Sequence, residues 1–153
     1  MLHQIGLFFH MVAIMLAAGG SVGAMLVEKQ LWSRINERPD DARAMMPILK
    51  SAPRLIMVGL AFFLVSGLIM LSSVNWIYLT QPWFIIKFVL FLSLPVRGAI
   101  IGRPTIKHIG MQISQSPTNM TALLPLKAKM LRFHIAQFCT IGVMFLLVLF
   151  KIG

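Results

Sequence analysis

The chain has 153 residues, of which 58% are hydrophobic and only 12% are charged, and its mean hydropathy is +0.85. This balance excludes an ordinary water-soluble domain and predicts an integral membrane protein. A net charge of +10 would favour a nucleic-acid partner in a soluble protein. Here the basic residues gather in two connecting segments, where positive charge sets membrane topology, so no nucleic-acid partner is expected.

Four apolar runs are long enough to cross the hydrocarbon core as helices, which takes about 20 residues each. They cover residues 5–27, 55–73, 83–102 and 135–150. The basic loops 28–54 and 103–134 are expected to face the cytoplasm, which leaves both termini on the outer, periplasmic side. The sequence therefore predicts one all-α transmembrane domain over residues 1–153, an up-down-up-down four-helix bundle in a bacterial inner membrane.

The first run carries a stripe of small or polar residues at spacings of four and three, which places them on one face of a helix. The stripe consists of Gly6, His10, Ala13, Ala17, Gly20 and Ala24. Small residues let membrane helices approach closely, so this face, with His10 on it, is expected to point into the bundle. Gly19 and Gly23 form a GxxxG pair on a neighbouring face, which is suited to packing a helix of this chain or of a partner. The start MLHQIG lacks the basic segment of a signal peptide, so we expect the run to be retained.

The second run, residues 55–73, repeats the pattern with Gly59, Ser66 and Ser73 at intervals of seven residues. In the third run, Pro95 removes one backbone hydrogen bond and is expected to kink the helix.

The connection before the last run, residues 110–126, contains Pro117 and Pro125 and is expected to be an irregular loop. Cys139 is the only cysteine and lies within the last run. No disulfide and no cysteine-based metal site is therefore expected within one chain.

Lys87 is the only charged residue between Trp83 and Leu94, in a run otherwise apolar enough to span a bilayer. The acidic residues of the chain are Glu28, Glu37, Asp40 and Asp41. All of them fall in the first basic loop, so no carboxylate of this chain is expected to pair with Lys87. A charge within the membrane costs on the order of 3 kcal/mol. The remaining possibilities are a lysine that snorkels to the outer headgroups, a deprotonated lysine or a bound anionic ligand.

His10 and Lys87 are expected at one depth, about 6 to 8 Å below the outer surface at 1.5 Å per residue. Considered alone, His10 is readily explained as a neutral histidine that is hydrogen-bonded to a neighbouring helix. Imidazole is also a good ligand of haem iron, and a lysine at this depth is able to bind a propionate or, if neutral, to supply a second ligand. His3, His108 and His134 lie at other depths, so two-histidine ligation within one chain is not expected.

Copper is an alternative because the chain has 12 methionines, and thioethers together with imidazole suit Cu(I). Met11 and Met15, however, lie about 100° round the helix from the stripe that carries His10. With no acid expected inside the membrane, the sequence predicts neither a carboxylate proton relay nor a site for a hard cation.

Three segments follow one another along the chain: FFHMVAIMLAAGG, then PRLIMVGLAFFLVSGLIML with an arginine before the span, then PWFIIKFVLFLSL. In this order they resemble the HemJ-type protoporphyrinogen oxidases and their relatives, the CopD-like small four-helix membrane proteins. The resemblance covers residues 5–103 and leaves the last run unmatched. In that family the first-helix histidine and the lysine of a W-x-x-[IL]-K motif are functional. They correspond to His10 and to Lys87 of WFIIK.

The resemblance implies a haem b whose iron is held by His10, with Lys87, Trp83 and Arg54 also at the cofactor site. It implies oxidation of protoporphyrinogen IX to protoporphyrin IX, with His10 and Lys87 as the catalytic residues. Two other functions stay open at this point, a cofactor-free accessory subunit of a larger membrane complex and a copper-handling protein. The expected partners are membrane lipid and a porphyrin substrate, and a homo-oligomer or a larger complex is possible.

Overall fold

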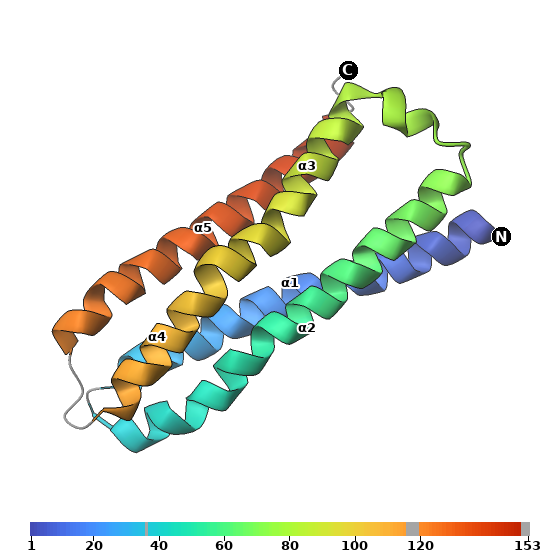
Figure 1. The fold of residues 1–153 in the computed structure, drawn as a ribbon. Coiled ribbons are helices and arrows are strands. Elements are labelled where there is room, and N and C mark those ends of the chain that lie inside the picture. The colour runs from blue at the N-terminus through green and yellow to red at the C-terminus, as the bar shows by residue number, and fades with distance from the viewer. Residues whose placement is uncertain (36, 116–119, 151–153) are drawn as a thin grey trace.

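The computed structural model describes residues 1–35, 37–115 and 120–150 and is helical almost throughout (Figure 1). The elements are α1 (Leu2–Arg34), α2 (Pro39–Ser72), the 3₁₀ turn η1 (Ile77–Thr80), α3 (Pro82–Arg97), the π-helical turn η2 (Gly98–Gly102), α4 (Arg103–Ser114) and α5 (Met120–Phe150). No strand occurs among the described residues, which confirms the predicted all-α class.

Four helical stretches are long and apolar enough to cross a membrane. They are His3–Arg34, Pro39–Ser72, Pro82–Ser114 and Met120–Phe150. These stretches indicate a multi-pass membrane protein, as the composition predicts, while the direction in which each helix crosses stays a prediction.

The helices form two pairs (Figure 1). In the first pair α1 and α2 lie side by side along their length. In the second pair the continuous helix α3–η2–α4 packs against α5, and Arg97 donates to Thr140 Oγ1 at 2.6 Å to join them. We call the end where α1 passes to α2 and α4 passes to α5 the basic end, and the opposite one the terminal end. The pairs meet at the basic end, where α4 contacts α2, and diverge toward the terminal end.

Small residues bring α1 and α2 together, as the stripe in the first run predicts. A Cβ built on Gly59 would lie 2.8 Å from the backbone nitrogen of Ala17, so the two backbones are almost in contact at this point. Gly6 lies against Met70 in the same way, and Ala13 is fully buried. Gly19 and Gly23 of the GxxxG pair instead face open space, and no described residue lies within 4 Å of a Cβ built on either of them.

The two segments predicted as loops are mostly helical. α1 continues to Arg34 and α2 begins at Pro39, so only a short turn separates them. The loop predicted over residues 110–126 is wrong for its described part, because α4 extends to Ser114 and α5 already contains Pro125. Pro117 lies outside the described residues.

An apolar core at the basic end explains why these extensions fold. It consists of Leu31, Ile35, Ala42, Met46, Leu49, Ile106, Ile109, Ile113, Leu123 and Met130. The three residues from α4 recur at spacings of three and four, so this helix buries one face although half of its residues are polar or basic. Charged residues on the outer face hide this periodicity from an analysis based on hydropathy alone.

The irregularity expected at Pro95 is located just after it. The helix runs through Pro95 and widens into the π-helical turn Gly98–Gly102 before continuing as α4. A proline removes one ladder hydrogen bond, and a π-helical turn is a common way for the backbone to absorb such a defect.

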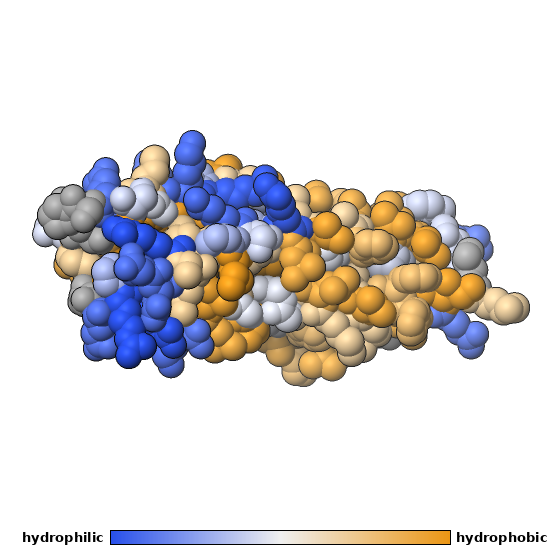
Figure 2. Space-filling model, turned by 90° about the horizontal axis from the view of Figure 1, so that it is seen from below, coloured by the Kyte–Doolittle hydropathy of each residue, from blue (hydrophilic) through white to orange (hydrophobic). Residues whose placement is uncertain are grey.

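Figure 2 shows how polarity is distributed along the molecule. Hydrophilic residues gather at the basic end, and hydrophobic residues cover most of the remaining length. A surface of this kind suits a bundle surrounded by lipid over most of its length, with one strongly basic end.

Candidate functional site

His10 is held on α1 by a hydrogen bond that fixes its tautomer. Its Nδ1 lies 2.9 Å from Ser66 Oγ on α2, and Ser66 Oγ donates to the carbonyl oxygen of Phe63 at 3.0 Å. A serine hydroxyl has a single proton, so when Ser66 donates to Phe63 it accepts from His10, and the proton of a neutral imidazole is then on Nδ1. Nε2 then carries a free lone pair, which is the arrangement that metal-ligating histidines use.

Aromatic and glycine neighbours set the orientation of the imidazole. The ring lies over Phe63 with 4.0 Å between centroids, and Phe63 stacks on Phe91 of α3 at 5.1 Å. A Cβ on Gly67 would lie 3.7 Å from His10 Cε1, so this glycine lets the ring lie close to the α2 backbone. His10 is therefore fixed in place before any ligand binds.

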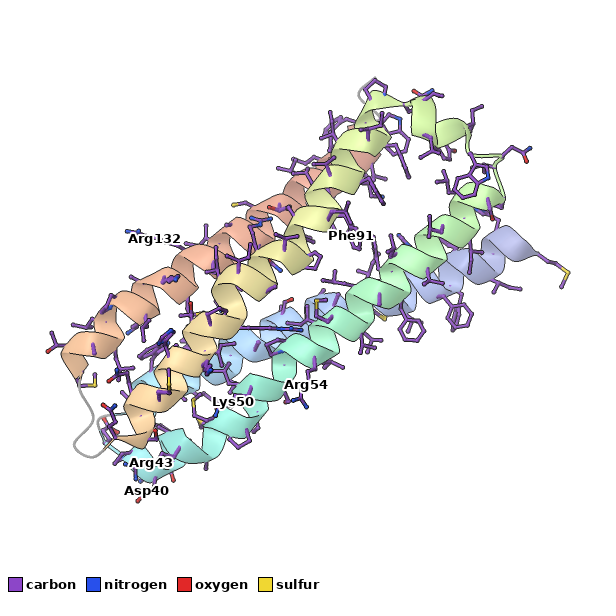
Figure 3. The ribbon with its side chains drawn as sticks, viewed as in Figure 1. Asp40, Arg43, Lys50, Arg54, Phe91 and Arg132 are labelled. Atoms are coloured by element: carbon purple, nitrogen blue, oxygen red, sulfur yellow. The ribbon has the colours of Figure 1, made fainter. Side chains whose placement is uncertain are left out.

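Two adjoining cavities separate the helix pairs beside His10. The larger, of about 300 Å³, lies between α1, α2, α3 and α5, and the smaller, of about 140 Å³, lies between α1, α2, η1 and α3. Both are lined by His10, Phe63, Lys87 and Phe91. Figure 3 shows Phe91 on α3 pointing into the space between the pairs. The remaining lining is mostly apolar, and the larger volume is at the lower end of the range for cofactor sites.

Lys87 therefore lies with His10, as the common depth predicts, and within electrostatic range of it. It makes no hydrogen bond or ion pair within the described part of the chain, although its side chain is half-buried. An amine in this position is available to an anionic group in the cavity.

The other two residues expected at the cofactor site lie elsewhere. Trp83 packs edge-on against Tyr78 and Phe84, at 5.5 and 5.8 Å between centroids, and reaches the smaller cavity only through Phe84. Arg54 is exposed on α2, about 18 Å along the helix axis from Ser66 at 1.5 Å per residue. It lines a separate cavity, so the structure does not bring Arg54 to His10.

Glu28 corrects the expectation that every acid lies in a loop outside the bundle. It belongs to α1 and is only 5% exposed, with Oε2 at 2.7 Å from Nε2 of His134 on α5. Trp32 Nε1 donates to Glu28 Oε1 at 3.1 Å. The small-residue stripe continues from Gly20 through Ala24 to Glu28 at steps of four, and this spacing was the sequence signal for its burial.

A third cavity, of about 60 Å³, lies beside the Glu28–His134 pair and continues the internal space. Ser21 and Gln137 line both this cavity and the larger one beside His10. Gln137 Oε1 is buried and has no hydrogen-bond partner among the described residues. A space of this size has room for a few water molecules, and the polar groups around it suit them.

The described residues contain no group of three or more His, Cys, Asp or Glu side chains that could hold a metal ion. The site by His10 offers one imidazole nitrogen, with the thioethers of Met70 and Met144 also lining the larger cavity. Met11 and Met15 are exposed, as their position off the stripe predicts.

Comparisons of the chain with protein-family models, with curated proteins and with solved structures find no match. The site must therefore be interpreted from its own residues.

Proposed function

We propose that this chain is a redox protein of the membrane that binds haem b between its two helix pairs, with His10 as the residue that would hold the iron. The observation that carries the proposal is the position of His10, whose Nδ1 lies 2.9 Å from Ser66 Oγ. Nε2 is left free beside an apolar cavity, which is what a haem-ligating histidine requires.

The surroundings of His10 suit a tetrapyrrole. Phe63 and Phe91 offer flat apolar surface to a macrocycle, and Lys87 offers a cation to a propionate. None of the described residues that line the two cavities is acidic, so no carboxylate of this chain competes with a propionate for Lys87. An axial histidine in an apolar pocket is one of the arrangements by which proteins hold haem.

The reaction we propose is the oxidation of protoporphyrinogen IX to protoporphyrin IX, on the basis of the resemblance carried by His10 and by Lys87 of WFIIK. No side chain here is redox-active enough for this multi-electron oxidation, and a bound haem would supply one-electron chemistry. His10 would hold the iron, Lys87 would orient a carboxylate, and the phenylalanines would exclude water. Trp83 would support the site from the adjoining aromatic cluster. We place the basic end in the cytoplasm of a bacterium, with the helices in its inner membrane.

Copper handling is a second candidate because Met70 and Met144 line the same cavity as His10. Two thioethers and one imidazole are a soft ligand set suited to Cu(I). Haem remains the first choice because Met70 packs against Gly6 at the α1–α2 interface, which accounts for its position without a metal.

An absorption spectrum of the detergent-purified chain, oxidised and then reduced with dithionite, tests the proposal. We expect a Soret band and, in a pyridine haemochrome assay, about one haem b per chain. His10→Ala should abolish the band and leave membrane insertion intact. His3→Ala is the matched control, because His3 makes the same kind of bond to Ser73 Oγ, at 2.9 Å, away from the cavities.

The other outcomes separate the alternatives. Bound copper without haem would favour copper handling. A colourless, metal-free protein would favour a cofactor-free accessory subunit of a larger membrane complex. Full haem content in His10→Ala would contradict ligation by His10. If haem is bound, protoporphyrinogen turnover decides whether the chain is an enzyme. Lys87→Met should then lower turnover, whereas normal turnover in that variant would favour a lysine that merely snorkels to the headgroups.

A further inference from the structure

Four cations surround one cavity between α2 and α4. Lys50 and Arg54 come from α2, and Arg103 and Lys107 come from α4. Each pair is four residues apart, so both of its members lie on one face of their helix. The cavity has a volume of about 330 Å³, and the Lys50 side chain reaches across to α4, where its Cε would lie 3.3 Å from a Cβ built on Gly110.

The acids of the chain do not neutralise this cluster. Glu28 is bonded to His134, Asp40 pairs with Arg43, and Asp41 pairs with Arg34 and Arg38. Within the described residues, none of the four cations around the cavity makes an ion pair or a hydrogen bond. Four like charges in one cavity repel each other, and an anionic ligand would relieve that repulsion.

Apolar stripes lead away from the cations toward the terminal end. On α2 the face of Lys50 and Arg54 continues through Val58, Phe62 and Val65 at spacings of four and three. On the facing helix, Leu92 and Val96 share a face at a spacing of four, and Ile100 lies in the π-helical turn just before Arg103. All six apolar side chains are exposed, with Ile100 at 67%. A free phosphate ion makes no contact with such apolar stripes, whereas the acyl chains of a lipid pack against them.

Figures 2 and 3 show where the cluster lies along the molecule. Figure 3 shows Lys50 and Arg54 on the half of α2 nearer the basic end, and in Figure 2 the hydrophilic surface of that end gives way to hydrophobic surface. This transition is the level at which lipid headgroups would surround a membrane-spanning bundle. Basic pockets between helices at this level are typical binding sites of anionic lipid headgroups.

We propose that Lys50, Arg54, Arg103 and Lys107 bind the headgroup of an anionic phospholipid, with its acyl chains along the two apolar stripes. Two pairs of cations on two facing helices fit a lipid with two phosphates of the cardiolipin class better than one with a single phosphate. The site uses Arg54, which the family resemblance assigns to the cofactor, and its occupancy does not depend on whether haem binds at His10.

The test is the thermal stability of the purified chain in neutral detergent, titrated with four additives in parallel. These are cardiolipin, phosphatidylglycerol, phosphatidylcholine and inorganic phosphate. We expect cardiolipin to raise the Tm at the lowest concentration, phosphatidylglycerol at a higher one, and the other two not at all. Native mass spectrometry of the purified chain should also detect retained anionic lipid.

The variant Lys50→Gln with Arg103→Gln removes one cation from each helix. At about 1 kcal/mol per cation near a lipid surface, it should need about 30-fold more cardiolipin for the same stabilisation. Lys129→Gln with Arg132→Gln is the matched control, because it removes the same charge from exposed positions of α5 that do not line the cavity. If the first variant does not fold, the single substitution Lys107→Gln should give a smaller loss of the same kind.

Three results would overturn the proposal. Equal cardiolipin responses in the cavity variant and in the control would mean that the cluster binds no lipid. Stabilisation by inorganic phosphate alone would indicate a site for a free anion. An equal response to phosphatidylcholine would indicate that the apolar surface alone holds lipid.

Discussion

Ser66 has a larger role than its size suggests, because it decides which nitrogen of His10 is free. Ser66→Ala removes the acceptor of the Nδ1 proton and lets the imidazole change tautomer and turn. Loss of such a supporting hydrogen bond typically costs about 10- to 100-fold in affinity for the bound metal. We therefore expect haem to transfer to apomyoglobin about 10- to 100-fold faster from the Ser66→Ala variant than from the unchanged chain. The transfer is followed by the absorbance of the Soret band.

Ser73→Ala is the control for this prediction. Ser73 accepts from His3 and donates to the carbonyl oxygen of Met70, so it repeats the geometry of Ser66 seven residues further along α2. It lines neither of the cavities beside His10. Equal haem transfer from both variants would show that the tautomer of His10 does not matter for binding.

At this scale the sequence predicts only part of the candidate site. The depth argument brings His10 and Lys87 together correctly, because depth follows from position along each helix. Arg54 is assigned to the site by the resemblance alone, and the structure places it about 18 Å along α2 from Ser66, at a separate cavity. The hydrogen bond between His10 and Ser66 depends on the register of α1 against α2. The glycine patterns indicate which faces of these helices meet, but they do not determine that register.

The α1–α2 pair depends on one very close approach, between Gly59 and Ala17. A methyl group added to Gly59 would meet the backbone nitrogen of Ala17 at 2.8 Å, and backbone cannot move aside as a flexible side chain does. Overpacking of this kind costs about 1–3 kcal/mol. Gly59→Ala should therefore lower the free energy of unfolding by about that amount, measured by denaturant titration in detergent, and should weaken haem binding by shifting α1.

Gly19→Ala is the matched control, since a Cβ at that position meets nothing within 4 Å. In a helix interior, alanine is favoured over glycine by up to about 1 kcal/mol, so this variant should be neutral or slightly stabilised. An unchanged free energy of unfolding in Gly59→Ala would contradict the close approach of the two helices.

The helices themselves are well predicted where they are apolar and poorly predicted where they are amphipathic. Hydropathy finds the four spans because lipid-facing residues are apolar without interruption. It misses the basic extensions of α1, α2, α4 and α5, which bury only one face in the core around Leu49 and Ile109. Pro125 gives a false signal for a loop, because packing of neighbouring Leu123 and Met130 holds the helix around it.

On the scale of the whole molecule, the four-helix fold follows from composition but the division into two pairs does not. The internal cavities exist because the pairs diverge toward the terminal end, and this divergence depends on which helices pack most closely. The pairs are held together at the basic end by the apolar core and by the bond between Glu28 and His134. That bond joins α1 to α5, so it links the first pair directly to the second.

Removing one partner of this bond should loosen the whole bundle. Glu28→Leu would leave the buried His134 imidazole and the partly buried indole N–H of Trp32 without their hydrogen-bond partner. Each buried polar group left without a partner costs about 1–3 kcal/mol. We expect that loss in the free energy of unfolding, while Glu37→Leu, which removes an exposed acid, should change it by less than about 0.5 kcal/mol.

The double variant of Glu28→Leu with His134→Leu makes the argument quantitative. Replacing both members of a buried pair by apolar side chains is often nearly neutral, because no unpaired polar group remains. The double variant should therefore be more stable than Glu28→Leu alone, and the double-mutant cycle should give a clear coupling energy. Simple additivity of the two single substitutions would mean that the two side chains do not interact, and that this bond does not help to join the helix pairs.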